Sequence, residues 1–498
     1  MTLTESLAAW ASGLELDEVP SRVVAYAKSQ ILSQLAAVRA GLGHPLGAAI
    51  TRAFGSPLGT DPVQSAYVLA ALTVALEFDD TVYAGHISHS TVNVPVAYAR
   101  RLDLDGRRLL TAVIAGNECA ARVTAAATLG PFRSQTAAHA HLVGSVASRL
   151  RAEGAWAEQW VNALGLAFAL PPWSLLRPFL GSDAKVLTAA VPVRMGLDAC
   201  DGAAAGLAGA PDVLEHPDGF LSRFAAVPLP DAVTAGLGRR WHTETLSFHL
   251  YPAATNIYSS VDCAVALHQA LAGCDPDEIE EVVVHASLFT VGATARTIPY
   301  LDGADSPVSS LQYSVPYSVA TALLTGDLTP DDFAPPAVGD PARWALAGKV
   351  RVEHDPALTE RAALGATPIG EALRQAGDRA AAWVERPGFS DASRLMSALG
   401  PPSETFENAE KSVGARIVVR LADGRELVRE SIIPKGTAGP ETRARHPQLL
   451  REKFLGSGGS AEVADAVATL EDASAEEVAD VLERALTRPS GESSHEPA

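Results

Sequence analysis

The stretch LEFDDTVYAGHISHS, residues 76–90, gathers residue types that can move protons. It contains Asp79, Asp80 and Thr81, and His86 and His89 follow nearby. A carboxylate, a hydroxyl and imidazoles close together suit proton transfer beside a carboxyl or carbonyl group. The stretch joins two apolar helical runs, and loops held on a rigid scaffold are where catalytic groups usually lie. It therefore indicates an active-site segment.

Three other interpretations of this segment stay open. An aspartate-rich magnesium–diphosphate site, as in helical terpene cyclases, needs a second downstream cluster of oxygen ligands, which NECAARVTA does not supply. His86 and His89, three apart, could bind a metal with Asp80 if the segment were helical, although its glycine and serines favour a loop. In a purely structural interpretation, Asp79 and Asp80 end a helix and the histidines lie on a solvated loop. We expect no metal.

Lysine is scarce, so Lys185 is conspicuous as the only lysine between Lys28 and Lys349. The formal net charge of -19 argues against a nucleic-acid partner, because phosphate binding needs a basic face. An anionic small-molecule substrate would have to be held by a local cationic pocket, since the overall field repels it.

The length of 498 residues predicts two domains rather than one core. The sequence contains no uninterrupted apolar run of about 18 residues and no basic-then-apolar start, so we expect no membrane span and no signal peptide. The four cysteines are scattered without metal-ligand or disulfide spacing, which favours a reducing, cytoplasmic location.

The elements that must position these residues are mainly helical. Thr4 is the expected N-cap of the first helix. Short β-branched runs begin after about residue 247, and ARIVVRLADGRELVRESI predicts a hairpin that turns at Asp423-Gly424. A helix over SVPYSVATALLT should end at Gly326. The predicted organisation is a helical domain over 1–246, an inserted α+β lid domain over 247–436, a helical return over 437–488 and a disordered tail over 489–498.

Several segments, in the same order along the chain, resemble the MmgE/PrpD family of 2-methylcitrate dehydratases and cis-aconitate decarboxylases. LEFDDT followed by histidine resembles its LDFDDT…HP signature. GSDAKVLTAAVPVRMGLDA, SFHLYPAATNIYSSVDCAVAL, LQYSVPYSVATALLTG and LREKF are similar to further family segments. The resemblance implies a helical domain with an inserted lid, a homodimer, an active site between the two, and no cofactor or metal. It also implies lyase or isomerase chemistry on small di- and tricarboxylates.

The resemblance transfers some site residues and alters others. Asp79, Asp80, Thr81 and Lys185 fall on family positions, His89 falls on the family histidine with His86 as the alternative, and Asp262 matches an aspartate at the lid entrance. Four positions depart from the family pattern: Glu77 replaces an aspartate, Gln135 or Arg133 a histidine, His249 a lysine and Tyr258 a histidine.

The predicted roles follow from side-chain chemistry. Lys185 would hold a developing enolate oxygen, His249 and Tyr258 are competent proton carriers, and Asp80 and Thr81 would orient the substrate or a histidine. The predicted catalytic residues are Lys185, His89, Asp80, Tyr258 and His249. The predicted substrate-binding residues are Thr81, Asp79, Glu77, His86, Gln135 and Arg133.

The departures make the pocket less cationic than in the family, unless Arg133, Arg177 or Arg194 compensates. We therefore expect a cofactor-independent lyase or isomerase whose substrate is less anionic than citrate. A natural product that undergoes dehydration, decarboxylation or cyclisation would fit. One alternative is an ordinary 2-methylcitrate or aconitate dehydratase or decarboxylase. The other is a family member that has lost catalysis and serves as a binding or scaffold protein.

Overall fold

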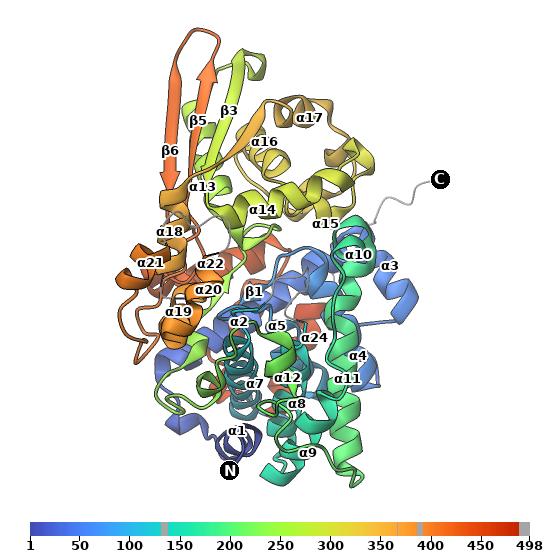
Figure 1. The fold of residues 1–498 in the computed structure, drawn as a ribbon. Helices are drawn as coiled ribbons and strands as arrows, with labels where there is room; N and C mark the ends of the chain where they lie inside the picture. The colour runs from blue at the N-terminus through green and yellow to red at the C-terminus, as the bar shows by residue number, and fades with distance from the viewer. Residues whose placement is uncertain (131–137, 366, 386–391, 488–498) are drawn as a thin grey trace.

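The computed structural model describes residues 1–130, 138–365, 367–385 and 392–487. Within these residues the chain is mainly helical, as predicted, and it forms two hydrophobic cores (Figure 1). No helix among the described residues is long and apolar enough to cross a membrane. The predicted disordered tail, 489–498, lies outside the described residues.

Alanine-rich helices form the N-terminal half of the larger core, where small side chains allow close packing. The first helix begins two residues earlier than predicted. Thr2, not Thr4, is the N-cap, because Thr2 and Glu5 form a reciprocal capping box and Thr4 is buried inside the helix. The helices are α1 Leu3–Ser12, α2 Ser21–Gly43, α3 Pro45–Phe54, α4 Pro62–Ala75, α5 Ser88–Thr91, α6 Asn93–Tyr98, α7 Gly106–Ala126, α8 Ala140–Glu153, α9 Ala157–Ala167, α10 Leu176–Gly181, α11 Leu187–Ala204 and α12 Phe220–Phe224.

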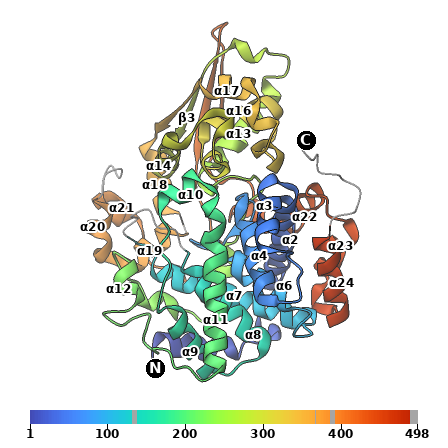
Figure 2. The same ribbon diagram turned by 90° about the vertical axis from the view of Figure 1, so that its right-hand side faces the viewer.

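The C-terminal end of the chain returns to the same core. Helices α22 (Pro440–Gly456), α23 (Ala461–Ala468) and α24 (Ala475–Leu486) all contact α2, and Figure 2 shows them beside it. Leu450 and Phe454 of α22 are completely buried there. The helical domain is thus assembled from both ends of the chain, as predicted.

The second core lies in an α+β unit built around a four-stranded sheet of order β4-β3-β5-β6. β3 (Ile279–Ala286) pairs parallel with β4 (Val350–His354) and antiparallel with β5 (Ala415–Leu421), which pairs antiparallel with β6 (Glu426–Ser431). Asp423-Gly424 forms the predicted turn, and Gly326 caps α16 at a φ of 80°. The helices of this part are α13 Tyr258–Ala270, α14 Leu288–Thr297, α15 Val308–Leu311, α16 Val315–Thr325 and α17 Pro341–Ala347.

Part of the predicted lid range packs on the helical core instead of on this sheet. Leu373, Trp383, Leu395 and Phe406 belong to the larger core. The second core holds residues from 251 to 350 and from 415 to 421. The helices that connect these two stretches are α18 Pro356–Leu364, α19 Ile369–Ala376, α20 Ala381–Val384 and α21 Ala392–Ala398.

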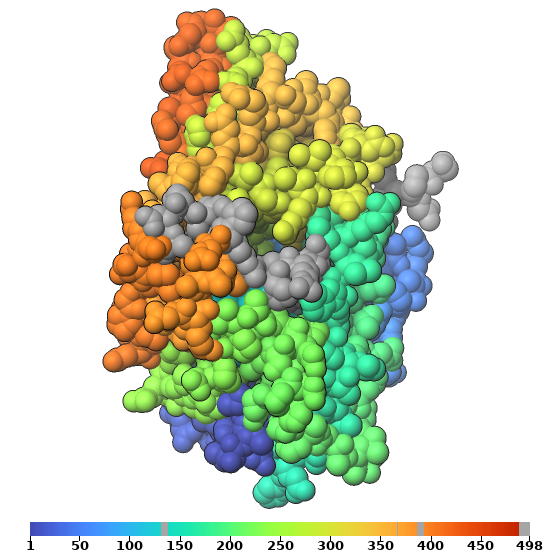
Figure 3. All heavy atoms as spheres, in the orientation of Figure 1, coloured from blue at the N-terminus to red at the C-terminus, as the bar shows by residue number. Residues whose placement is uncertain are grey.

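A two-stranded antiparallel ribbon lies where the chain passes between the two cores. It consists of β1 (Asp80–Thr81) and β2 (Ser247–Phe248). The returning chain closes on it, because the Phe248 N–H donates to the carbonyl of Gly436 at 2.8 Å. The surface is hollowed where the α+β unit meets the helical domain (Figure 3).

We predict that Gly436→Ala destabilises the protein more than Gly424→Ala does. Both glycines have a left-handed φ, 85° and 87°, which costs an alanine roughly 1–2 kcal/mol. A Cβ at Gly436 would also lie 2.5 Å from the carbonyl oxygen of Phe248, whereas a Cβ at Gly424 has no neighbour within 4 Å among the described residues. Equal losses of unfolding free energy in urea titrations would show that the close approach is not needed.

Candidate active site

The register of the ribbon places neighbouring aspartates on opposite faces. Asp80 lies opposite Phe248, and the backbone N–H of His249 donates to the Asp79 carbonyl at 3.1 Å. Side chains alternate along a strand, so Asp79, Thr81 and His249 share one face while Asp80 points from the other. The two acidic residues of the FDDT motif therefore have different surroundings.

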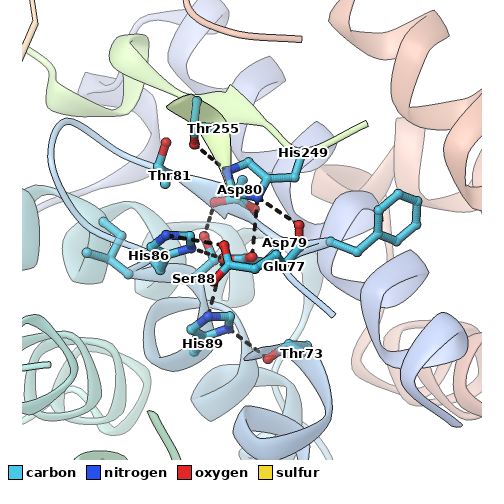
Figure 4. A network of polar contacts seen from close by, with 12 residues as sticks. Thr73, Glu77, Asp79, Asp80, Thr81, His86, Ser88, His89, His249 and Thr255 are labelled. Atoms are coloured by element: carbon cyan, nitrogen blue, oxygen red, sulfur yellow. Dashed lines mark hydrogen bonds and ion pairs between the residues drawn. The ribbon is translucent and has the colours of Figure 1, made fainter. Parts of the chain in front are cut away.

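Asp79 is fully buried and is surrounded by three imidazoles (Figure 4). Its Oδ2 lies 2.8 Å from His86 Nδ1 and 3.2 Å from His89 Nε2, and its Oδ1 lies 3.6 Å from His249 Nδ1. Burial alone would raise the pKa of Asp79, but the nearby imidazoles hold it well below its usual value. The carboxylate is therefore ionised inside the protein.

The hydrogen bonds of His249 determine its tautomer. Nδ1 lies 2.9 Å from the carbonyl oxygen of Glu77, which can only accept, so Nδ1 carries the hydrogen. Nε2 then accepts from the hydroxyl of Thr255 at 2.8 Å. Burial lowers the pKa of His249 to about 4, so this imidazole is neutral at physiological pH.

His89 is oriented in a similar way from the helical side. Its Nε2 faces the ionised Asp79 carboxylate, so that nitrogen carries the hydrogen, and Nδ1 accepts from the Thr73 hydroxyl at 2.8 Å. Asn93 Nδ2 donates to the same hydroxyl oxygen at 3.0 Å. Burial lowers the pKa of His89 to about 4. His89 is completely buried, so the interpretation that it lies on a solvated loop is wrong.

His86 differs from the other two because about a third of its side chain (34%) is exposed. A tight turn over residues 82–85, with Tyr83 at a φ of 54°, brings it back over Asp79. Burial opposes its charge, but the carboxylates of Asp79 and Glu77 outweigh that effect and raise the pKa of His86 to about 9. His86 is thus the most accessible imidazole of the three and carries a proton at neutral pH.

Glu77 and Lys185 form a second buried pair beside this cluster. Lys185 Nζ lies 2.9 Å from Glu77 Oε1 and donates to Gln312 Oε1 at 2.5 Å. The Tyr313 hydroxyl donates to the same Glu77 oxygen at 2.9 Å. Burial opposes the charge of Glu77, but Lys185 and His86 lower its pKa; burial also lowers the pKa of Lys185, although Glu77 opposes this. The contact geometry makes this an ammonium–carboxylate pair whose lysine releases its proton more readily than an exposed lysine would.

Asp80, predicted as catalytic, is bound into a different network. Its Oδ2 accepts from Gln34 Nε2 at 2.9 Å, and Ser88 donates to its Oδ1. Burial and the neighbouring Asp79 raise the pKa of Asp80 to about 6. These contacts tie β1 to α2 on the face away from the three imidazoles, with Lys453 approaching from the same side.

The other predicted residues are placed as follows. The Tyr258 hydroxyl donates to the backbone carbonyl of Tyr251 at 2.7 Å, and its ring lies edge-on to His249 with centroids 5.2 Å apart. Thr81 is buried and accepts from Lys411 Nζ at 3.1 Å. Gln135 and Arg133 lie outside the described residues.

Arg177 and Arg194, which could have replaced the positive charge of the family's lysine and histidines, lie away from the cluster. Arg177 and Arg194 are exposed, and Arg194 contacts Gln64 and the ring of Tyr67 on α4. Neither of these two arginines therefore supplies the compensation that was left open for a less cationic pocket.

Four polar residues of the site or its border were missed from the sequence. Gln312 and Tyr313 stand inside LQYSVPYSV, and the resemblance of this segment to the family is the signal that could have found them. His141 is buried with its ring centroid 5.5 Å from that of His89, and its AAHAH context gave no signal. Lys411 has no local motif and is 330 positions from its partner Thr81.

Four of these side chains could in principle bind a cation. One atom each from Glu77, Asp79, His86 and His249 lies within 4.8 Å of the others. However, the Lys185 ammonium already pairs with Glu77, and His86 and His249 direct hydrogens from Nδ1 to protein oxygens. A metal would need a nitrogen free of hydrogen on each imidazole, whereas His86 keeps both hydrogens at neutral pH and the Nε2 of His249 already accepts from Thr255. The arrangement therefore favours protons over a metal ion.

Comparison with known proteins gives consistent matches. The MmgE/PrpD N-terminal domain matches residues 5–230 and the MmgE/PrpD C-terminal domain matches residues 251–389. The cis-aconitate decarboxylase of Aspergillus terreus strain NIH 2624 is 26% identical over 71% of this chain and 78% of its own length. The 2-methylcitrate dehydratase of Cupriavidus necator is 27% identical over 61% of this chain and 65% of its own length. A cis-aconitate decarboxylase-like protein of Aspergillus oryzae is 22% identical over 71% of this chain and 80% of its own length.

We predict that removing metal ions leaves the protein unchanged. Dialysis against EDTA should alter neither its melting temperature nor its activity, because Lys185 supplies the cation beside Glu77. Differential scanning fluorimetry before and after dialysis, with Zn²⁺ or Mg²⁺ then added back, measures this. A melting temperature restored by stoichiometric metal would contradict it.

We also predict a pH-dependent contribution of His86 to stability. Its pKa is raised in the folded state, so its contribution is fully present below the unfolded value near 6.5 and is lost as pH rises through about 9. Wild type should therefore be more stable than His86→Gln at pH 6, and the difference should shrink between pH 7 and 10. A difference in melting temperature that is constant with pH would show that His86 is not protonated by its neighbours.

Proposed function

The chain belongs to the MmgE/PrpD family, whose matched relatives are lyases, and from that premise we propose that it is a lyase that works by proton transfer next to a carboxylate. The observation that carries this proposal is His86, an accessible imidazole that keeps its proton at neutral pH beside the Lys185 ammonium. We further propose that the enzyme needs no cofactor.

Decarboxylation uses this arrangement most directly. When the bond to the leaving carboxylate breaks, its electron pair enters an enolate-type system, which the Lys185 ammonium would stabilise. A preorganised cation or donor of this kind is worth several kcal/mol at the transition state. His86 would then deliver its proton to the carbon and regain one from water. His89 and His249 would act by holding Asp79 ionised, so that His86 stays charged.

Dehydration is the second candidate, and a specific observation favours it. Removal of a proton next to a carboxylate requires a base, and Lys185 is a lysine whose pKa is lowered by complete burial. In that reaction His86 would protonate the departing hydroxyl. Asp79 is a poor base because its pKa is so low.

We propose that the substrate carries fewer negative charges than a tricarboxylate. His249 is neutral at a position where the resembling family has a lysine. Within the cluster, the charges of Glu77 and Asp79 are balanced by Lys185 and protonated His86, so the cluster has no excess positive charge to balance a tricarboxylate. Homodimeric assembly and a cytoplasmic location stay predictions.

We predict that the purified protein catalyses turnover or proton exchange with a small unsaturated or hydroxylated polycarboxylate, and that Lys185→Met abolishes it. The panel is cis-aconitate, 2-methylcitrate, citramalate and itaconate, assayed for CO₂ release, for absorbance of the new double bond and, by NMR in D₂O, for deuterium next to a carboxylate. The exchange assay detects proton transfer even without net elimination.

The expected loss in Lys185→Met is about 100-fold or more, since one such donor is worth roughly 2.7–4 kcal/mol. Lys349→Met is the matched control, because Lys349 Nζ donates to the Ile279 carbonyl away from the site. Activity in Lys185→Met that stays close to that of the wild type would contradict the assigned role. A wild type inert in all three assays would favour the binding or scaffold alternative.

A further inference from the structure

Lys411 is a partly buried lysine at the edge of the candidate site that the proposed chemistry does not use. It precedes β5, and its backbone N–H donates to the Ala438 carbonyl at 2.9 Å. Its Nζ donates to Thr81 Oγ1 at 3.1 Å. Across the described residues no carboxylate lies within ion-pair distance of this ammonium.

The ribbon register puts Lys411 on the same side as the catalytic cluster. Its partner Thr81 shares a strand face with Asp79, two residues along β1. The Cα atoms of these two residues are about 7 Å apart along the strand. The ammonium thus approaches the ribbon, through Thr81, on the face that carries Asp79 and His249.

Lys453 provides an internal comparison. It approaches the other face of the ribbon, and its Nζ has three acceptors: Ser33 Oγ at 2.9 Å, the Phe78 carbonyl at 2.7 Å and the Asp79 carbonyl at 3.3 Å. All three hydrogens of that ammonium have an acceptor. Within the part of the chain that the structure describes, Lys411 has one acceptor for the same three hydrogens, and that acceptor is a neutral hydroxyl.

A partly buried ammonium with so few protein partners depends on water for its other hydrogen bonds. Burial lowers the pKa of Lys411 to about 8, and no neighbouring carboxylate opposes this. A carboxylate placed against it would accept from the unused N–H groups and balance the charge. Such charge-assisted hydrogen bonds are the strong ones in proteins.

We propose that Lys411 and Thr81 together bind a second carboxylate of the substrate, which makes a dicarboxylate the class of ligand this site takes. The inference rests on the proposed function, in which Lys185 and His86 act on the first carboxylate or the carbon beside it. Lys411 is a binding residue here and takes no part in bond making or breaking.

The first test is steady-state kinetics of Lys411→Met on whichever acid of the panel the wild type turns over. KM should rise about 10- to 100-fold, the worth of one charge-assisted hydrogen bond, while kcat changes less than about threefold. Lys411→Arg keeps the charge and should recover most of the affinity. Lys435→Met is the matched control, because the Lys435 side chain is exposed and only its backbone N–H contacts Asp262.

The second test does not depend on turnover. Succinate should raise the melting temperature of wild type and Lys435→Met more than butyrate does, since a ligand that binds only the folded state stabilises it. In Lys411→Met the two acids should become equivalent. If the wild type showed no turnover but preferred succinate to butyrate through Lys411, the proposed function would be refuted, and Lys411 and Thr81 would still be a carboxylate-binding site. A KM that is unchanged in Lys411→Met, or a preference for succinate that persists in this variant, would show that Lys411 and Thr81 do not bind a carboxylate. The proposed function would still stand.

Discussion

The ionised carboxylate of Asp79, fully buried, is the constraint on which the rest of the site depends. Holding such a charge out of water costs several kcal/mol unless donors surround it. Those donors come from separate parts of the chain: His86 and His89 follow β1, and His249 follows β2. The cluster therefore forms only when the segments around residues 80 and 249 have paired. The charge balance of the cluster and the pairing of β1 with β2 therefore depend on each other.

The ribbon also lies at the boundary between the two cores. Phe248 is part of the helical core and Tyr251 is part of the α+β core, so His249 stands between them. The backbone of His249 is fixed to Asp79 and its ring to Glu77, both on the helical side, while Thr255 approaches its Nε2 from the α+β side. A displacement of the α+β unit would act first on the hydrogen bond to Thr255. The tautomer of His249 is thus fixed by contacts from both cores, while burial keeps the ring neutral.

The sequence predicts the larger features of this protein well, because they depend on local patterns. Helical periodicity, the turn at Asp423-Gly424 and the cap at Gly326 all appear where expected. Boundaries that depend on packing do not follow from such patterns: residues 369–409 read as part of the inserted domain, yet Trp383 and Phe406 are buried in the helical core. Contacts between residues far apart in the sequence decide which of the two cores a short helix packs on.

The sequence predicted which residues belong to the candidate site better than it predicted how their side chains are arranged. The FDDT segment and Lys185 do meet in space, through Glu77. What the sequence could not give is the direction of each side chain. Asp79 and Asp80 look equivalent in the sequence. In the structure, Asp79 faces three imidazoles, whereas Asp80 faces Gln34 and Ser88. Lys411 was invisible for another reason, since only the folded chain brings it to Thr81.

The alternation of side chains along β1 has a consequence for how this site can change over evolutionary time. Positions 79 and 81 face the region where a substrate would bind, whereas positions 78 and 80 face the helical core. A substitution at position 81 can thus alter selectivity, whereas Asp79 must stay to hold the imidazoles and positions 78 and 80 preserve the packing on the helical core. Insertion or loss of a single residue between 78 and 81 would exchange the two sets at once. New substrates are therefore reachable here by replacement, but not by changes in length.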